Sequence, residues 1–323
     1  MSVPTAEGEP AEGDGHVSAP GGAASVTVRV PAKVNVQLAV GAARPDGFHD
    51  LANVFLAVGL YDEITVTPAD ALRITCTGPD AAQVPLDATN LAARAAIALA
   101  ARHGIDPRVH IHIAKDIPVA GGMAGGSADG AGALLACDTL WGLGSSQDEL
   151  LDICAELGSD VPFSLLGGAA LGTGRGEHLT PIDVDGGFHW VFAVADGGLS
   201  TPTVFREFDR LAEGTDIPAP TAAPALLAAL RAGDPTALAA TLANDLQPAA
   251  LALRPSLADT LAAGTAAGAL AALVSGSGPT TAFLVKSAAE AALVANSLLG
   301  SGTCRTARVA DSPARGATVV EGP

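Results

Sequence analysis

The segment 117–143 sets a dense run of glycines and one hydroxyl group directly before an expected helix. It reads IPVAGGMAGGSADGAGALLACDTLWGL. Its clustered small and polar residues are Gly121, Gly122, Gly125, Gly126 and Ser127. An anion site forms where a glycine-rich turn joins a strand to the start of a helix, because main-chain N–H groups converge there at the positive end of the helix dipole. Glycines in the turn have no Cβ, so a phosphate can come close to the main chain. The segment therefore favours phosphate binding, with a flexible turn before a tightly packed helix as the alternative.

Spacing excludes two well-known phosphate loops. The P-loop needs a lysine between its last glycine and the hydroxyl residue, whereas Ser127 directly follows Gly126. The dinucleotide fingerprint Gly-x-Gly-x-x-Gly does not occur in this loop.

Two charged residues outside the loop could take part in chemistry. Asp160 stands in GSDVPF, where a helix cap is the ordinary interpretation of an Asp before x-Pro. Lys33 is one of only three lysines, against fourteen arginines, and its neighbours Val34 and Val36 are apolar. A surface lysine is the ordinary interpretation there. Neither residue identifies a reaction on its own.

Both strands and helices are expected to position these residues. Strands are expected at 25–30 and 34–40, on either side of a kink at 31–33, and at 63–67, 72–77, 108–114, 168–173, 190–195, 270–275, 281–285 and 304–309. Helices are expected at 90–103, from the loop to about 143, and at 146–157, 222–231, 235–246, 257–267 and 288–299. This order predicts an α+β chain with two lobes. We expect an acidic disordered tail at 1–24, an N-terminal nucleotide-binding lobe at 25–175, a C-terminal lobe at 176–311 and a flexible tail at 312–323.

Composition narrows the possible partners and location. The net charge of −17 argues against a nucleic-acid partner, because a phosphate backbone requires a basic face. No uninterrupted apolar run reaches membrane-spanning length, and the acidic N-terminus lacks the features of a secretory signal. The four cysteines form no Cys-x-x-Cys pair, which is typical of free thiols in a reducing cytosol. A cytoplasmic protein is expected, with neither a membrane nor a nucleic acid as partner.

Three segments resemble the motifs of the GHMP kinase superfamily, in matching order. They are PAKVN at 31–35, the glycine-rich loop with its pattern P-x-x-x-G-x-x-G-G-S, and SGSGP at 275–279. Members of this superfamily are small-molecule kinases that hold ATP without a Walker lysine. The resemblance implies a two-lobed GHMP kinase fold, with an N-terminal lobe like ribosomal protein S5 domain 2 and a ferredoxin-like α/β C-terminal lobe.

Two further signatures narrow the resemblance. RPDGFH at 44–49 and LGSDVPF at 157–163 are similar to the GHMP kinases that phosphorylate the 2-hydroxyl of 4-diphosphocytidyl-2-C-methyl-D-erythritol, in the non-mevalonate isoprenoid pathway. The likeness spans roughly 30–310. Another GHMP kinase, of the homoserine or mevalonate type, and a non-catalytic GHMP-fold ligand-binding protein are the alternatives.

The resemblance also implies roles for individual residues. Asp160 becomes the general base, and Lys33 lies beside it and the γ-phosphate, where its charge stabilises the transferred group. The segment implied to hold the ATP phosphates comprises Pro118, Val119, Ala120, Gly121, Gly122, Met123, Ala124, Gly125, Gly126, Ser127 and Ala128. Ala128 stands where the family usually has a second serine.

The acceptor substrate is implied to contact a separate set of residues, which are Asn35, Phe48, His49, Gly276, Ser277 and Gly278. Phe48, where the family commonly has Tyr, would stack on cytosine, and His49 would hydrogen-bond to its edge. Arg175 is expected either to contact phosphates or to be solvated. Mg²⁺ is expected with the nucleotide, without identified protein ligands; Asp138 is a candidate, with a capping role as the alternative.

Overall fold

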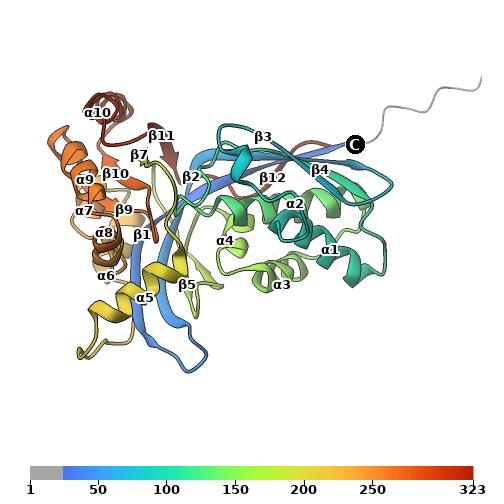
Figure 1. Cartoon of the computed structure of the whole chain (residues 1–323), viewed down its shortest axis with the longest axis horizontal. Helices are drawn as coiled ribbons and strands as arrows, with labels where there is room; N and C mark the ends of the chain where they lie inside the picture. Colours follow the sequence, from blue (N-terminus) through green and yellow to red (C-terminus); the bar gives the residue numbers. More distant parts are fainter. Residues whose placement is uncertain (1–24, 323) are drawn as a thin grey trace, which may run out of the picture.

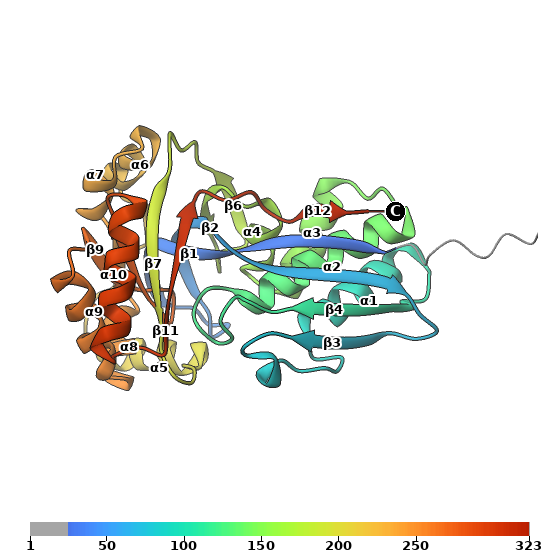
Figure 2. The same cartoon turned by 90° about the horizontal axis from the view of Figure 1, so that it is seen from above.

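The computed structural model describes residues 25–322, and the acidic tail expected at 1–24 lies outside them. The larger of its two sheets has eight strands in the order β12-β1-β2-β4-β3, with β5 and β8 paired to β2 and β1 and β6 paired to β5. These strands are β1 (Val26–Ala43), β2 (His49–Pro68), β3 (Arg73–Thr77), β4 (Val109–Ala114), β5 (Ala169–Thr173), β6 (His178–Pro181), β8 (Ala243–Asn244) and β12 (Thr318–Glu321). Figure 2 shows the long strands β1 and β2 side by side along the middle of the molecule.

Strand β1 contains the PAKVN motif at 31–35 and continues without a break through Pro31. The expected break at 31–33 is wrong, because β1 is continuous from Val26 to Ala43 and only its register with β2 shifts between Pro31 and Ala32. β12 pairs with β1 only at residues 27–29. Pro31 lies beyond that pairing and opposes Tyr61 of β2 at the register shift, an irregularity of the kind at which a strand tolerates the missing N–H of proline.

Four helices cover one face of this sheet (Figure 1). They are α1 (Leu91–His103), α2 (Gly125–Trp141), α3 (Gln147–Leu157) and α4 (Val161–Leu166), and a short 3₁₀ turn, η1, spans Ala81–Gln83. The small residues of α2 serve packing. A Cβ on Gly132 would lie 2.6 Å from the side chain of Ile64 on β2, and one on Gly130 would lie 3.2 Å from Leu91 on α1. The helix can approach both neighbours only because these side chains are missing.

The second sheet has the order β11-β7-β10-β9. Its strands are β7 (Phe188–Val194), β9 (Ala271–Val274), β10 (Thr281–Val285) and β11 (Thr306–Ser312), and its helices are α5 (Thr201–Leu211), α6 (Pro224–Ala232), α7 (Pro235–Ala239), α8 (Gln247–Leu253), α9 (Ser256–Ala266) and α10 (Ala288–Ser301). Phe283 on β10 packs in one cluster with Val294 of α10. Trp190 and Phe192 on β7 belong to the core of the first sheet. The two lobes therefore share a continuous apolar core.

Several expected boundaries are wrong. Within the segment expected as a flexible tail, residues 318–321 form β12 and pair with β1. β6 at 178–181 still pairs with β5, so the first sheet extends past the expected lobe boundary at 175. The helix expected at 235–246 ends at Ala239, and β8 follows. The helix α5 is not among the expected elements.

Candidate active site

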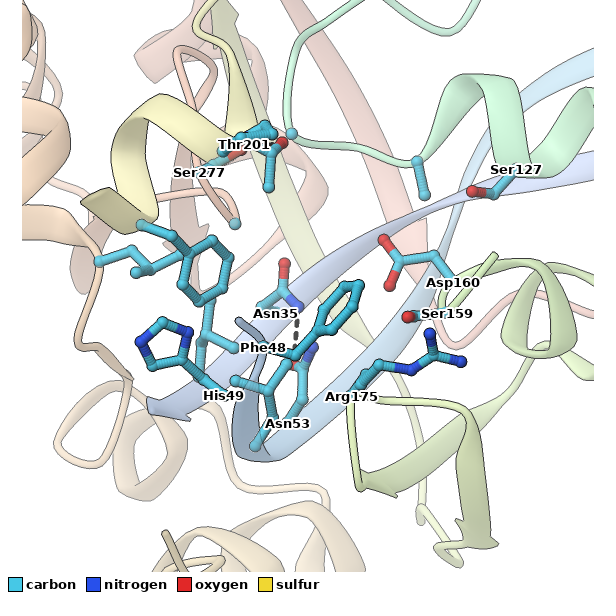
Figure 3. A pocket seen from close by; sticks show the side chains of 18 of the residues that line it. Asn35, Phe48, His49, Asn53, Ser127, Ser159, Asp160, Arg175, Thr201 and Ser277 are labelled. Atoms are coloured by element: carbon cyan, nitrogen blue, oxygen red, sulfur yellow. Dashed lines mark hydrogen bonds between the residues drawn. The ribbon is translucent and has the colours of Figure 1, made fainter. Parts of the chain in front are cut away.

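A cleft of about 660 Å³ opens between the glycine-rich loop, the turn end of the β1–β2 hairpin and α5. This volume is typical of a site for a small molecule. Lys33, Asn35, Phe48, His49, Ser127 and Asp160 line it together. Figure 3 shows the side chains of Asn35, Phe48, His49, Ser127 and Asp160 around one space, although they come from distant parts of the sequence.

The centre of the cleft holds a cation and a carboxylate. Nζ of Lys33 lies 3.5 Å from Oδ2 of Asp160. The lysine side chain is buried, at 6% exposure, whereas that of Asp160 is 32% exposed. Nζ also donates a hydrogen bond to Oδ1 of Asn35 at 2.6 Å, and Nδ2 of Asn35 donates to Oδ1 of Asn53 at 2.6 Å. The chain of amides, part of which Figure 3 draws, fixes the ammonium group opposite the carboxylate.

Asp160 precedes the first residue of α4, as its sequence context predicts, but its side chain does not cap that helix. It occupies the N-cap position and makes no side-chain capping hydrogen bond. A capping carboxylate would point to the main-chain N–H groups of its own helix. The Asp160 carboxylate instead faces the cleft and Lys33.

The glycines of the loop have different surroundings. Gly122 has φ of +76°, and a Cβ there would lie 2.0 Å from the carbonyl oxygen of Ser275. A Cβ on Gly125 would lie 2.9 Å from Nζ of Lys115. Gly126 is exposed, and the nearest atom to its Cβ position is a Leu91 methyl carbon 3.9 Å away. The first two glycines are required by protein neighbours, and Gly126 is the one with open space for a ligand.

The turn 275–279 of the second lobe packs against the loop. Oγ of Ser275 donates to the carbonyl oxygen of Gly122 at 3.1 Å, and the hydroxyl groups of Ser277 and Thr201 lie 2.9 Å apart. Asn244 fixes the turn by donating to the carbonyl oxygens of Val274 and Gly276, at 2.8 and 2.7 Å.

Aromatic and charged side chains line the far end of the cleft. The guanidinium carbon of Arg175 lies 5.2 Å from the ring centroid of Phe48, whose side chain is exposed. Arg175 also pairs with Glu177 at 3.2 Å. Burial raises the pKa of Glu177, but hydrogen bonds from main-chain N–H groups and from Arg175 outweigh it, so this pKa is lowered. Arg175 therefore already has an ionised partner.

α5 supplies residues that the sequence analysis missed. Nε2 of His49 lies 2.8 Å from Oδ1 of Asp209, and its ring stacks on Phe205 with centroids 5.0 Å apart. Phe205, Arg206 and Asp209 all line the cleft. Phe205 and Asp209 are four residues apart and thus share a helix face. The signal available in the sequence was a serine before Thr-Pro, followed by an amphipathic pattern to Leu211.

Not every expected site residue reaches the cleft. Pro118, Val119, Met123, Ala128 and Gly278 do not line it. The side chains of Met123 and Ala128 are buried in the core of the first sheet. A Cβ on Gly278 would face Val274.

Asp138 does not support a role in Mg²⁺ binding. It lies near the C-terminal end of α2, away from the loop, and accepts a hydrogen bond from the N–H of Ser145 at 3.1 Å. Between residues 25 and 322, no group of three or more His, Cys, Asp and Glu side chains could hold a metal ion. In the same range, no helix is both long and apolar enough to cross a bilayer.

Comparison with known families matches both lobes. The model for the GHMP kinases N terminal domain matches residues 90–168, and the model for the GHMP kinases C terminal domain matches residues 226–302. The expected GHMP kinase fold is thereby confirmed.

Proteins of known name align with this chain over almost their whole length. A protein from Streptomyces avermitilis named 4-diphosphocytidyl-2-C-methyl-D-erythritol kinase is 79% identical, over 92% of this chain and 100% of its own. Its namesake from Streptomyces coelicolor is 74% identical with the same coverage. A crystal structure of 4-(cytidine 5'-diphospho)-2C-methyl-D-erythritol kinase superposes with a TM-score of 0.72 at 31% identity, covering 89% of this chain and 99% of that one. Homoserine kinase from Cytophaga hutchinsonii shares the fold, with a TM-score of 0.71 at 20% identity over 92% of this chain and 97% of its own.

Proposed function

Because this chain belongs to the family of 4-diphosphocytidyl-2-C-methyl-D-erythritol kinases, we propose that its cleft transfers the γ-phosphoryl group of ATP to the 2-hydroxyl of that substrate. The products would be the 2-phosphate and ADP, within the non-mevalonate route to isoprenoid precursors. The observation that carries the proposed mechanism is the Lys33–Asp160 pair, which faces the glycine-rich loop inside one cleft.

Asp160 acts as the general base. The acceptor is a tertiary alcohol, whose pKa lies far above neutrality, so its proton must leave as the bond to phosphorus forms. The partly exposed carboxylate of Asp160 makes no capping hydrogen bond and is available to accept that proton. Such a positioned base contributes roughly 10²–10⁴-fold to a rate.

Lys33 stabilises charge on both sides of the transfer. Its ammonium group has three N–H donors. One is used by Asn35, and a second is available to the Asp160 carboxylate in the ion pair. A third donor remains for an oxygen of the transferred phosphoryl group, where negative charge must be offset during the transfer.

The loop before α2 holds the phosphates of ATP. Gly126 and Ser127 lie at the helix N-terminus and line the cleft, so main-chain N–H groups and a hydroxyl are available there. Ser127 and Asp160 are oxygen donors that line the cleft beside the loop. Mg²⁺ commonly binds through substrate phosphates and one or two protein oxygens, which this donor set fits. When bound, the ion would neutralise charge on the phosphates.

The far end of the cleft binds the cytidine diphosphate part of the acceptor. Phe48 and Phe205 offer aromatic faces to a base. With Nε2 of His49 held by Asp209, Nδ1 is the ring nitrogen left for the edge of cytosine. Arg206, whose side chain lines the cleft, is a cation available for the diphosphate, together with Arg175.

A cytoplasmic location is part of the proposal. All four cysteines are free thiols, as in proteins of a reducing compartment. The strongly acidic composition supports a small-molecule substrate rather than a nucleic acid.

A substrate panel with an ADP readout tests the proposal. We expect ADP release from ATP only when 4-diphosphocytidyl-2-C-methyl-D-erythritol is added. Equal turnover of homoserine or mevalonate would assign the chain to a sibling kinase activity. No turnover with any acceptor, combined with retained ATP binding, would favour a non-catalytic ligand-binding protein.

A further inference from the structure

The imidazole ring of His49 is contacted on three sides by one face of α5. Oδ1 of Asp209 lies 2.8 Å from its Nε2, the ring of Phe205 stacks on it with centroids 5.0 Å apart, and the ring of Phe208 meets it edge-on at 83°. Phe208 and Asp209 follow Phe205 by three and four positions, so the three side chains share a helix face. The His49 side chain is only 4% exposed. Its orientation is therefore fixed before any substrate binds.

α5 is anchored to both lobes away from this ring. Val204 is fully buried in an apolar cluster with Val40 of β1 and Leu246, the residue before α8. At the start of the helix, the hydroxyl groups of Thr201 and Ser277 lie 2.9 Å apart. The helix thus holds its carboxylate at a fixed place beside the hairpin that carries His49.

The contact with Asp209 determines which ring nitrogen of His49 carries the proton. An ionised carboxylate only accepts hydrogen bonds, so Nε2 must be the donor. A neutral imidazole has a single N–H group, which leaves Nδ1 as an acceptor. Nδ1 makes no hydrogen bond within residues 25–322 and is not among the enclosed unpaired atoms of that range. It is therefore open to the cleft that His49 lines (Figure 3).

The two carboxylates in the second half of α5 have separate partners. Within the part of the chain that the structure describes, Asp209 forms an ion pair with His49 alone. Glu207 instead accepts two hydrogen bonds from Arg210, at 2.8 and 2.7 Å, and does not line the cleft. Asp209 is thus the carboxylate of α5 that acts on the cleft, and Glu207 offers a matched control.

We propose that Asp209 is a positioning residue that fixes this tautomer of His49, and that the cleft thereby selects a pyrimidine with an amino group at C4 over one with a carbonyl group. This inference rests on the proposed binding of the cytidine diphosphate part at this end of the cleft. The exocyclic amino group of cytosine is a donor and matches the lone pair of Nδ1. O4 of uracil is an acceptor, so it would face that lone pair without a hydrogen bond.

The test compares two acceptor substrates, 4-diphosphocytidyl-2-C-methyl-D-erythritol and its uridine counterpart, with saturating ATP at pH 8. We expect kcat/KM of the wild type to be at least about tenfold higher for the cytidine compound, because a site built to hydrogen-bond one group rejects an analogue that leaves its own polar atom unpaired.

Asp209→Asn separates the tautomer from the shape of the side chain. The amide can donate through Nδ2 as well as accept through Oδ1, so Nε2 of His49 no longer has to carry the proton. The other tautomer can then donate from Nδ1 to O4 of uracil. The ratio of the two kcat/KM values should therefore fall by at least about fivefold. A general loss of structure would lower both values together and leave their ratio unchanged.

Glu207→Gln is the control for this substitution. It also replaces a carboxylate of α5 by an amide, but at a side chain that pairs with Arg210 and does not line the cleft. Its ratio of kcat/KM values should equal that of the wild type.

¹⁵N spectra of the histidine side chains measure the tautomer directly. At pH 8 the wild-type His49 signals, assigned from their loss in His49→Gln, should show a protonated Nε2 and an unprotonated Nδ1. In Asp209→Asn both signals should move towards the average of the two tautomers, and in Glu207→Gln they should not change.

Each remaining outcome decides the question. A proton on Nδ1 of wild-type His49 overturns the inference, as does an equal ratio of kcat/KM values in wild type and Asp209→Asn, and both results leave the kinase proposal intact. If Asp209→Asn does not fold, the wild-type spectrum and the wild-type ratio decide, and equal kcat/KM values for the two compounds overturn the inference. If wild type phosphorylates neither compound, the proposed function fails and this inference fails with it.

Discussion

Removing the Asn35 side chain tests whether the pair of amides Asn35 and Asn53 positions Lys33, the proposed catalytic cation. In Asn35→Ala, Nζ of Lys33 loses its acceptor at 2.6 Å, and Oδ1 of Asn53 loses its donor. Asn35 and Asn53 are both almost fully buried, at 1% and 4% exposure, so bulk water does not simply replace the lost groups. We therefore expect a loss of both stability and turnover.

The magnitudes follow from the type of each contact. A hydrogen bond to a charged group contributes about 1.5–3 kcal/mol, and a buried amide oxygen left unpaired costs a further ~1–3 kcal/mol. The free energy of unfolding should therefore fall by roughly 2.5–6 kcal/mol. If the charged contact serves to hold Nζ in the reacting geometry, the same ~1.5–3 kcal/mol corresponds to an about 10- to 150-fold lower kcat.

The assay is steady-state ADP release with both substrates varied, alongside urea unfolding. Asn53→Ala is the matched control, because it removes only the neutral amide contact of about 1 kcal/mol and leaves the acceptor of Lys33 in place. Its kcat should fall by no more than about fivefold. A normal kcat in Asn35→Ala with a raised KM for the acceptor would refute the positioning role and show that Asn35 contacts substrate directly.

Further predictions concern the base, the glycines and the thiols. Asp160→Asn should keep ATP binding in calorimetry and lose roughly 10²–10⁴-fold in kcat; a near-normal rate would exclude Asp160 as the base. Gly126→Ala should unfold within about 0.5 kcal/mol of wild type yet raise the KM for ATP, since its Cβ enters open space at the loop. Gly122→Ala should lose at least about 2 kcal/mol in urea unfolding, because its φ of +76° and the carbonyl oxygen 2.0 Å away both exclude a methyl group; equal stability of the two variants would contradict these loop contacts. Burial raises the pKa of the Cys137 thiol well above its usual range and that of Cys154 to about 12, so both should resist a thiol reagent at pH 8 until denaturant is added; rapid labelling of all four cysteines would contradict this.

The main elements of the fold could be predicted because local patterns specify them. The alternation in β4 places Val109, Ile111 and Ile113 inside, as expected from RVHIHIA. The N-terminal cap of α3 is also local, since the Ser146 hydroxyl accepts the N–H of Glu149. In such segments propensity, periodicity and capping all agree.

Elements that depend on distant partners could not be predicted in this way. Thr318–Glu321 is short and lies near the end of the chain, and it is a strand only because β1 offers it an edge. The helix expected at 235–246 stops early because Asn244 and Asp245 bond instead to the turn after β9 and to the N–H of Val40. Alanine-rich sequence fits either outcome, so tertiary contacts decide it.

Some residues of the candidate site could likewise be predicted from the sequence, and others could not. Lys33, Asp160 and the loop were found from motifs, and the cleft brings them together. Phe205 and Asp209 were not found, because the sequence does not show that α5 packs against the cleft. The scarcity of lysine was a usable signal for Lys115, although the sequence does not show that its partners are Asp62 and Asp129.

The contacts of the loop explain how the two halves of the cleft keep one geometry. The carbonyl oxygen of Gly121 accepts the N–H of Thr280 at 3.3 Å, and that of Met123 accepts the N–H of Lys33 at 3.3 Å. The glycine-rich loop is thus bonded through its main chain both to the second lobe and to the strand that carries Lys33. In a transfer whose catalysis consists mostly of positioning and charge stabilisation, a fixed distance between donor and acceptor is itself a large part of the rate. The glycines matter here because a Cβ at 121 would lie 2.8 Å from the Thr280 hydroxyl and one at 122 would lie 2.0 Å from the Ser275 carbonyl oxygen, so either would push the loop away from the second lobe and disturb the proposed geometry.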